Sequence, residues 1–304
     1  MSKRVVSLLP SATELLVALG ATDWLVGRSH ECDWPESVTD RPMLTAQRTV
    51  ATESADIDAQ VRAALQDGDS LYTLDTEQLK ALAPDVILTQ DLCEVCSIDL
   101  ATVRGVVRTM SPMPEVVSLD PKNLSDVLDD LLKVGAALGL QDHAQGVRAE
   151  LWARVEAASG LYNDAAPTVA FIEWMAPLFV GGHWTPEIIE RAGGRHPLNP
   201  AGAKSIVVTP EALVDLAPDF LLCAPCGYRL DQTRAEWETL TAIPGWETIP
   251  AVQSGRVALA DGNALFNRPG PRLVDALEQV AQWLRTGEIP DVPEWSAPPS
   301  PDRS

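Results

Sequence analysis

Residues 77–88 read EQLKALAPDVIL and residues 211–222 read EALVDLAPDFLL, with identical residues at seven of twelve positions. In each copy, leucines at helical spacing precede a Pro-Asp turn and a short apolar run typical of a buried strand. Two copies so far apart are too few for a repeat array and favour two similar lobes, although such common patterns also allow coincidence. The pair predicts a chain made of two related halves.

Alternating strand and helix patterns extend from both copies. The predicted strands are 5–9, 24–27, 86–89, 116–119 and 169–172, and the predicted helices include 57–65, 76–82 and 185–192. Strands that alternate with helices form mostly parallel sheets, because each helix serves as a crossover between neighbouring strands. The sequence therefore predicts an α/β fold with two similar lobes, each built on a mostly parallel sheet.

The segment between the halves has a different pattern. Residues 123–161 keep helical periodicity, with Gly135, Gly139 and Gly146 as positions where a helix would kink or break. A long helix or helix pair here would act as a rigid connection. The predicted domains are an N-terminal lobe at 1–121, a connecting helical region at 122–164, a C-terminal lobe at 165–287 and a disordered, Pro- and Ser-rich tail at 288–304.

Composition narrows the function classes. The formal net charge is −20, with 46% hydrophobic and 22% charged residues, as in globular proteins. So acidic a chain is a poor partner for nucleic acid or an anionic membrane, because both attract clustered Lys and Arg. No apolar run reaches transmembrane length, and the start of the chain lacks a signal-peptide pattern, so a cytoplasmic location and reduced cysteines are expected.

Ligands of open α/β sheets bind at loops that leave the carboxyl ends of strands. Those loops are rich in aromatic and polar residues, and the candidate ligand contacts are Pro10, Ser11, His30, Trp34, Asp91, Trp174, His183, Trp184, Tyr228, Phe266 and Arg268. Flat aromatic faces suit a large, partly apolar ligand such as a macrocycle, whereas ordinary packing is the alternative for each ring taken singly. His30 and His183 are also candidates to bind a metal centre that the ligand carries.

Two Cys-x-x-Cys pairs raise a separate possibility. Cys93 and Cys96 follow one predicted strand, and Cys223 and Cys226 accompany another. Cys93, Cys96 and Cys226 form a candidate metal or redox set, while Cys223, where a strand ends, is expected to be a buried thiol. Inert or ligand-touching thiols are the alternative. The chain has no nucleophile elbow, phosphate-binding glycine loop or helical His-Glu-x-x-His motif, which favours a binding protein over an enzyme.

Five blocks carry a family resemblance: RVVSLLPSATELLVALG, VGRSHECDWP, LAPDVILTQDLCEVC, GGHWTPEIIERAGG and DGNALFNRPGPRLVDALE. Over roughly residues 4–284 the chain resembles the cobalamin-binding members of the substrate-binding proteins of ABC transporters. The resemblance implies two lobes joined by one long backbone helix, with the ligand held between the lobe tips. It also implies that Glu77 and Glu211 dock to a membrane permease, although both residues equally suit helix N-termini.

The leading interpretation is a monomeric binding protein for cobalamin or a related corrinoid, with no required cofactor. Ser11, Asp91 and Arg268 are the expected polar contacts with the ligand's amides or phosphate. Haem or a ferric siderophore is an alternative ligand, because the same fold serves both. Two competing hypotheses are a cysteine-dependent metal-binding, redox or corrinoid-processing enzyme and an interaction module that uses only its acidic face. An ABC permease is the expected partner if the protein is exported.

Overall fold

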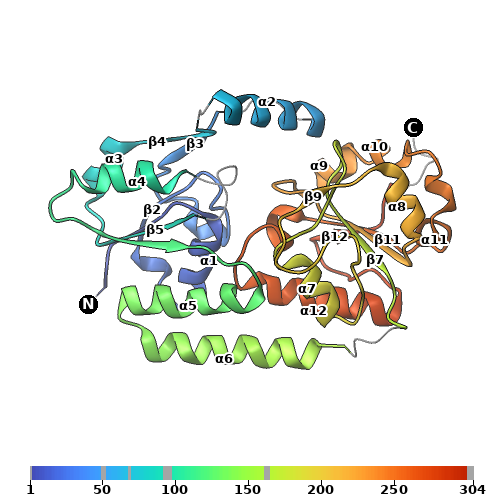
Figure 1. The fold of residues 1–304 in the computed structure, drawn as a ribbon. Helices are drawn as coiled ribbons and strands as arrows, with labels where there is room; N and C mark the ends of the chain where they lie inside the picture. Colours follow the sequence, from blue (N-terminus) through green and yellow to red (C-terminus); the bar gives the residue numbers. More distant parts are fainter. Residues whose placement is uncertain (1, 49–52, 68–69, 92–97, 161–164, 300–304) are drawn as a thin grey trace. The chain divides into compact units, whose positions relative to one another are not determined.

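The structure is a computed structural model that describes residues 2–48, 53–67, 70–91, 98–160 and 165–299. It divides into two compact units (Figure 1). Unit 1 comprises residues 1–52, 56–121 and 125–152, and unit 2 comprises residues 53–55, 122–124 and 153–304. The predicted lobe boundaries were drawn from sequence alone and stay a prediction.

Unit 1 contains a four-stranded parallel sheet in the order β2-β1-β5-β6. Its strands are β1 (Val5–Ser7), β2 (Leu25–Arg28), β5 (Val86–Gln90) and β6 (Glu115–Leu119). All four overlap the predicted strands. A separate antiparallel pair, which the sequence patterns did not predict, consists of β3 (Thr45–Gln47) and β4 (Tyr72–Leu74).

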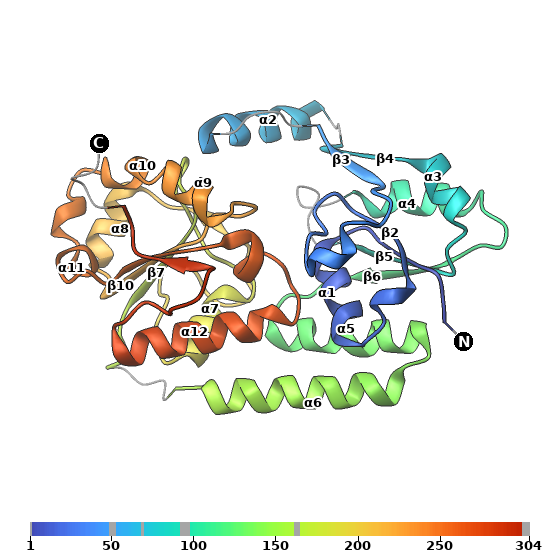
Figure 2. The same cartoon turned by 180° about the vertical axis from the view of Figure 1, so that it is seen from behind.

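Helices cover both faces of this sheet (Figures 1 and 2). They are α1 (Pro10–Ala18), α3 (Thr76–Leu82), α4 (Leu100–Val107) and α5 (Leu124–Leu138). A further helix, α2 (Ser54–Asp67), is inserted between β3 and β4. Leu79 of α3 and Val103 of α4 pack with Val6 and Ile87 of the sheet in one buried cluster. The apolar sides of the helices thus enclose a sheet that is buried on both faces, as its strand sequences predict.

The connecting region contains two helices, α5 (Leu124–Leu138) and α6 (Gln141–Ala158). The break falls at Gly139, which has a left-handed φ of 75° that glycine adopts without a side-chain clash. A Cβ on Gly135 would lie 2.5 Å from the Cβ of Ala144, so the close approach at this turn also requires glycine. The connecting region is thus a helix pair, which the sequence patterns allowed, and its second helix, α6, is 18 residues long and crosses the boundary between the units at residues 152 and 153.

Unit 2 contains a six-stranded sheet in the order β12-β11-β10-β7-β8-β9. The central strands β7 (Val169–Trp174), β10 (Phe220–Cys223) and β11 (Val257–Ala260) are parallel. The outer strands β8 (Phe179–Val180), β9 (Ile206–Val207) and β12 (Trp295–Ser296) run antiparallel to their neighbours. The sheet is mixed, but its predicted parallel centre is present.

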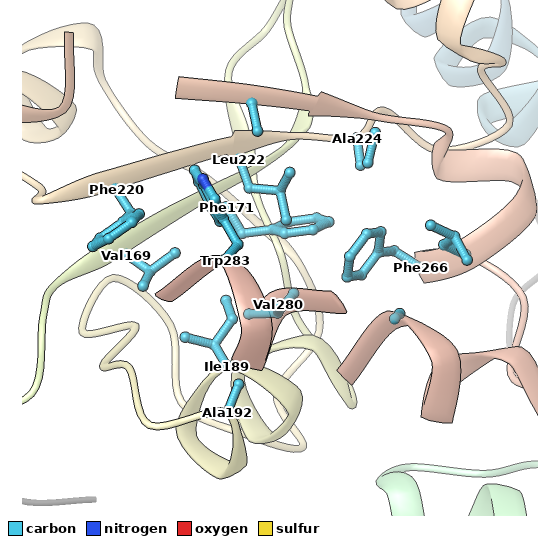
Figure 3. Packing of buried hydrophobic residues seen from close by; sticks show 14 of the residues in the cluster. Val169, Phe171, Ile189, Ala192, Phe220, Leu222, Ala224, Phe266, Val280 and Trp283 are labelled. Carbon is cyan, nitrogen blue, oxygen red and sulfur yellow. The ribbon is translucent and has the colours of Figure 1, made fainter. Parts of the chain in front are cut away.

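The core of unit 2 lies between this sheet and two of its helices. Those helices are α7 (Thr185–Arg191) and α12 (Arg272–Thr286), and the unit also contains α8 (Pro210–Leu216), α9 (Leu230–Ala235), α10 (Glu238–Thr241) and α11 (Pro250–Gln253). Figure 3 shows Phe220 beside Trp283, whose ring centroids are 4.9 Å apart at nearly a right angle. Buried aromatic rings prefer this edge-to-face arrangement.

The duplicated segments fold alike. In each, a capping side chain starts the helix: Asp75 accepts the backbone N–H of Gln78, and Thr209 accepts that of Ala212. Each helix ends at an alanine in the left-handed conformation, Ala83 with φ 41° or Ala217 with φ 47°, directly before the proline.

The aspartate of each Pro-Asp turn then makes the same contact. Asp85 accepts the backbone N–H of Arg4 at 2.7 Å, and Asp219 accepts that of Thr168 at 2.8 Å. Arg4 and Thr168 directly precede β1 and β7, the strands that pair with β5 and β10. The shared sequence therefore encodes a complete helix–turn–strand unit and its attachment to the neighbouring strand, which confirms the prediction of two similar halves.

The predicted disordered tail from residue 288 is wrong for residues 288–299. Trp295 is buried, its indole Nε1 donates to Gln279 Oε1 at 2.7 Å, and β12 pairs with β11. One large aromatic side chain that fills a place in the core outweighs the Pro- and Ser-rich composition around it. Residues 300–304 lie outside the described part of the chain.

Candidate ligand-binding site

In unit 1, the candidate residues lie at or near the carboxyl ends of β1, β2 and β5. Pro10 and Ser11 begin α1 directly after β1, and Ser11 is buried. His30 follows β2 and is half-buried, Asp91 follows β5 and is exposed, and Trp34 is 39% exposed. Because the ends of neighbouring parallel strands lie at one edge of the sheet, these residues share that edge.

A hydroxyl network surrounds His30. Its Nδ1 lies 2.7 Å from Thr45 Oγ1, its backbone N–H donates to the same oxygen, and Thr45 in turn donates to Ser29 Oγ at 3.0 Å. The ring of Tyr72 lies 5.6 Å from the imidazole. Thr45 and Tyr72 come from β3 and β4, which the sequence did not reveal as strands, so this support of His30 was missed.

In unit 2, Trp174 and Tyr228 form an aromatic pair at the ends of β7 and β10. Their ring centroids are 5.1 Å apart in an edge-to-face arrangement. Tyr228 is buried, and its hydroxyl donates to Glu236 Oε1 at 2.6 Å. Burial first, and then the hydrogen bond to Glu236, raise the pKa of Tyr228 above its ordinary value, so the phenol stays protonated. The structure thus brings together two of the predicted aromatic contacts.

His183 has a left-handed backbone with φ 52°, which is uncommon for a residue other than glycine. Its N–H donates to Ala203 O at 2.6 Å, and its carbonyl accepts from Gly202 N at 2.8 Å, so both backbone groups are held. Burial lowers the pKa of His183, and the positive charges of Lys122 and Lys204 lower it further. The imidazole is therefore neutral at pH 7, the form that binds metal centres.

Trp184, Phe266 and Arg268 are all buried, at 5%, 0% and 4% exposure. The indole of Trp184 donates to the backbone oxygen of Phe266 at 2.7 Å, and the Phe266 ring packs 5.0 Å from Phe171 in the core of unit 2 (Figure 3). Phe266 therefore packs in the core, which was the alternative to ligand contact for each aromatic ring, and it is not a proposed ligand contact.

Glu173 is a residue at this edge that the sequence patterns did not single out. Its Oε1 accepts from Ser205 Oγ at 2.7 Å and its carboxylate from the Gly182 N–H, while its backbone oxygen accepts from Cys226 N at 2.9 Å. Burial raises the pKa of Glu173 above its ordinary value. Glu173 thus connects the loops that contain His183 and Cys226 to β7. Its position directly after the predicted strand 169–172 is the sequence feature that could have identified it.

Cys223 and Cys226 differ in their exposure to solvent. Cys223 is fully buried within β10, and burial raises the pKa of its thiol, which disfavours the reactive thiolate. Cys226 is exposed. Cys93 and Cys96 lie outside the described residues, so the proposed metal set stays a prediction. Within the described residues, no group of three or more His, Cys, Asp or Glu side chains is placed to hold a metal ion.

The two proposed docking glutamates occupy equivalent places. Glu77 is in the first turn of α3 with its side chain 84% exposed, and Glu211 is in the first turn of α8 and exposed. Lys80 lies 3.0 Å from the Glu77 carboxylate. Acidic groups in a first helical turn also interact favourably with the helix dipole. No helix in the described part of the chain has the length and apolarity to cross a membrane.

Comparisons with known proteins agree with this architecture. Residues 5–264 match the family model described as periplasmic binding protein. An uncharacterized ABC transporter substrate-binding lipoprotein, YvrC of Bacillus subtilis, is 26% identical over 92% of this chain and 79% of its own length. The vitamin B12-binding protein of Yersinia pestis is 22% identical over 95% of this chain and 89% of its own.

Among solved structures, the periplasmic heme-binding protein HutB of Vibrio cholerae superposes with a TM-score of 0.71 at 20% identity, over 93% of this chain and 99% of its own. A likeness at this identity concerns the fold. The family model covers most of the chain, including the ends of β1, β5, β7 and β10. This chain belongs to the periplasmic binding protein family.

Proposed function

We propose that the protein is the solute-binding component of an ABC transporter and binds a corrinoid or another large metal-centred macrocycle. The observation that carries the proposal is the half-buried ring of Trp174 at the end of β7, which the buried Tyr228 supports edge to face at 5.1 Å between ring centroids. Aromatic side chains there offer apolar area to a wide, flat ligand, and hydrogen-bonding groups nearby set its orientation. Relatives named for vitamin B12 and for haem binding support this ligand class.

The ligand is tested by titrating the protein separately with cyanocobalamin, hemin and a ferric siderophore, followed by calorimetry and absorbance. We expect saturable one-to-one binding of cyanocobalamin, with weaker binding of the other two. Saturation by hemin alone would assign the protein to haem. Absence of heat and of spectral change with all three at micromolar protein would contradict the proposal.

His183 is proposed as the side chain that binds the ligand's metal centre, because its neutral imidazole is held by a locked backbone. His183→Ala should abolish the shift in the ligand's visible absorbance band while leaving most of the affinity from apolar contacts. The exposed His143 provides the matched control, His143→Ala. Identical ligand spectra in His183→Ala and the wild-type protein would remove His183 from this role.

Docking to a permease through Glu77 and Glu211 is the second part of the proposal. The double change Glu77→Lys and Glu211→Lys should leave ligand affinity unchanged, because both side chains are exposed, and should abolish uptake of labelled cobalamin by cells that depend on this protein. The double change Glu238→Lys and Glu247→Lys, at two other exposed positions, is the charge-matched control. Unchanged uptake would contradict docking at these residues. The expected cytoplasmic location stays a prediction that fractionation of cells tests.

A further inference from the structure

Three residues between β8 and α7, Gly181, Gly182 and His183, have every backbone polar group hydrogen-bonded within unit 2, and we call them the His183 segment. Four of the bonds join backbone groups: Gly181 N to Phe171 O, Thr185 N to Gly182 O, His183 N to Ala203 O and Gly202 N to His183 O. Two involve side chains: the Glu173 carboxylate accepts the Gly182 N–H, and Asn199 Nδ2 donates to Gly181 O at 3.1 Å. The segment therefore cannot change its conformation without breaking at least one of these bonds.

A second stretch of unit 2 packs closely against the His183 segment. A Cβ on Gly182 would lie 2.4 Å from Ser205 N and 2.6 Å from Ala203 O, so the two backbones touch and only glycine fits there. Glu173 completes the connection, because its Oε1 accepts the Ser205 hydroxyl at 2.7 Å and its carboxylate also accepts the Gly182 N–H. One side chain at the end of β7 thus holds both stretches.

His183 keeps its left-handed backbone inside this frame although it carries a Cβ. Such a conformation persists only where the surrounding structure over-determines it, and residues of this kind cluster at functional sites. The imidazole also lies 5.4 Å from the ring of Trp184 by centroid distance, and the Trp184 indole is itself fixed to Phe266 O at 2.7 Å. Backbone and ring of His183 are both held, so the protein itself sets the direction of the imidazole.

We propose that Glu173 is a positioning residue, which acts through the Gly182 N–H to hold His183 where its imidazole reaches the metal centre of the ligand. The link to the ligand rests on the proposed function, which assigns His183 to the metal. A metal-binding atom has to be held within about 0.5 Å of its productive geometry by supporting hydrogen bonds and packing. Loss of the Glu173 carboxylate therefore weakens the bond to the metal while the aromatic contacts with the ligand remain.

The hold on the segment is tested without any ligand, by NMR-detected hydrogen–deuterium exchange at the Gly182 amide. Glu173→Ala should speed exchange of this amide by about tenfold, the change expected when one hydrogen bond is lost. Glu173→Gln keeps one acceptor oxygen and should give a smaller increase. Asp219→Ala is the matched control, because Asp219 accepts the Thr168 N–H at 2.8 Å at the opposite end of β7, away from the His183 segment. Exchange at Gly182 should not change in this control.

Equal exchange at Gly182 in Glu173→Ala and Asp219→Ala would overturn the proposal. If Glu173→Ala unfolds and exchange rises throughout unit 2, Glu173→Leu replaces it, since leucine fills a similar volume without an acceptor. Faster exchange at Gly182 in Glu173→Leu than in Asp219→Ala then supports the proposal, and no difference between them overturns it.

The positioning of the imidazole is tested by the visible absorbance of bound cyanocobalamin, or of hemin if only hemin binds. Glu173→Ala should lose most of the band shift that wild-type protein causes, as His183→Ala does, while most of the affinity remains. Glu173→Gln should restore much of the shift, and Asp219→Ala should keep all of it, which separates positioning from a general loss of stability.

A wild-type band in Glu173→Ala, alongside a lost shift in His183→Ala, would show that Glu173 does not position the imidazole. If neither probe binds, or if His183→Ala leaves the band unchanged, the proposed role of His183 fails and the link to the metal fails with it. Exchange at the Gly182 amide still decides, in that case, whether Glu173 holds the His183 segment.

Discussion

The buried carboxyl group of Asp130 makes the stability of the fold depend on pH. Asp130 on α5 is fully buried, with one oxygen 2.6 Å from Lys133 Nζ. Burial raises the pKa of Asp130 from 3.8 to about 6, because desolvation outweighs the favourable charge of Lys133. The unfolded chain releases this proton near pH 4, whereas the folded chain holds it until about pH 6. Stability from this group is therefore greatest below pH 4 and falls as the pH rises to 6.

Asp130→Asn should remove this pH dependence. The free energy of unfolding of the variant relative to wild type should increase between pH 4.5 and pH 7.5, by up to about 3 kcal/mol for a shift of this size. Urea unfolding at several pH values measures the difference. Asp142→Asn, at an exposed position of α6, removes the same charge and serves as the control. Parallel pH profiles for Asp130→Asn and wild type would contradict the assignment.

Sequence patterns picked out the candidate site residues by their position after predicted strands, but they did not predict which groups surround those residues. Trp174, His183 and Tyr228 stood out because they follow predicted strands. Glu236, which accepts the Tyr228 hydroxyl, is only eight residues further along the chain, at the end of α9, but no sequence motif marks it as a partner. His196, which no sequence pattern singled out, is 3% exposed, and its Nδ1 lies 2.9 Å from Val169 O, because the chain after α7 returns to β7.

At the scale of elements, the duplicated helix–turn–strand unit retains a strained residue in both copies. Ala83 and Ala217 are left-handed, where a Cβ is unfavourable and glycine is the usual residue after a helix. Both alanines precede a proline, which cannot continue the helix. Both halves keep this unfavourable backbone conformation at the end of the helix. We infer that the turn geometry, which positions the aspartate to accept a hydrogen bond from the residue before the neighbouring strand, prevails over the backbone preference of alanine.

Ala83→Gly and Ala217→Gly should each stabilise the protein slightly, by up to about 1 kcal/mol, because relief of the left-handed strain exceeds the added entropy of the unfolded chain. Thermal and urea unfolding measure the change. Ala81→Gly, inside α3, is the control and should instead lower the free energy of unfolding by about 1 kcal/mol. A loss of stability in both left-handed variants would show that the backbone strain is negligible.

The elements that sequence patterns predicted lie in periodic stretches or in apolar runs; β1 has only three residues, but it belongs to the apolar run at 5–9. The strands at the centres of both sheets and the helices α3 and α7 match their predicted positions closely. By contrast β3, β4, β8, β9 and β12 have only two or three residues each, too few for alternation to be visible.

At the scale of the whole molecule, the last described strand closes the core of unit 2. The Trp295 ring lies 5.7 Å from Trp283 and 6.2 Å from Phe266 by centroid distance. β12 also pairs with β11 and covers one edge of the sheet. Unit 2 therefore depends on residues beyond the lobe boundary that sequence patterns indicated at residue 287.

Trp295→Ala should destabilise unit 2 by about 3 kcal/mol, because it removes a large buried ring and leaves a cavity beside Trp283. Urea unfolding followed by tryptophan fluorescence and circular dichroism measures the loss. Trp34→Ala, in unit 1 at a position 39% exposed, should change stability far less. Equal unfolding midpoints for the two variants would contradict the role of Trp295 in the core.

The aspartate contacts of the two duplicated segments also have a consequence for biosynthesis. Arg4 and Asp85 are 81 residues apart in the chain, whereas Thr168 and Asp219 are 51 residues apart. At about 5–20 residues per second, the ribosome adds the acceptor roughly 4 to 16 s after the donor in unit 1 and roughly 3 to 10 s after it in unit 2. During synthesis the equivalent attachment is therefore completed after a longer wait in unit 1 than in unit 2, whereas a full-length chain refolding from denaturant has every donor and acceptor available from the start.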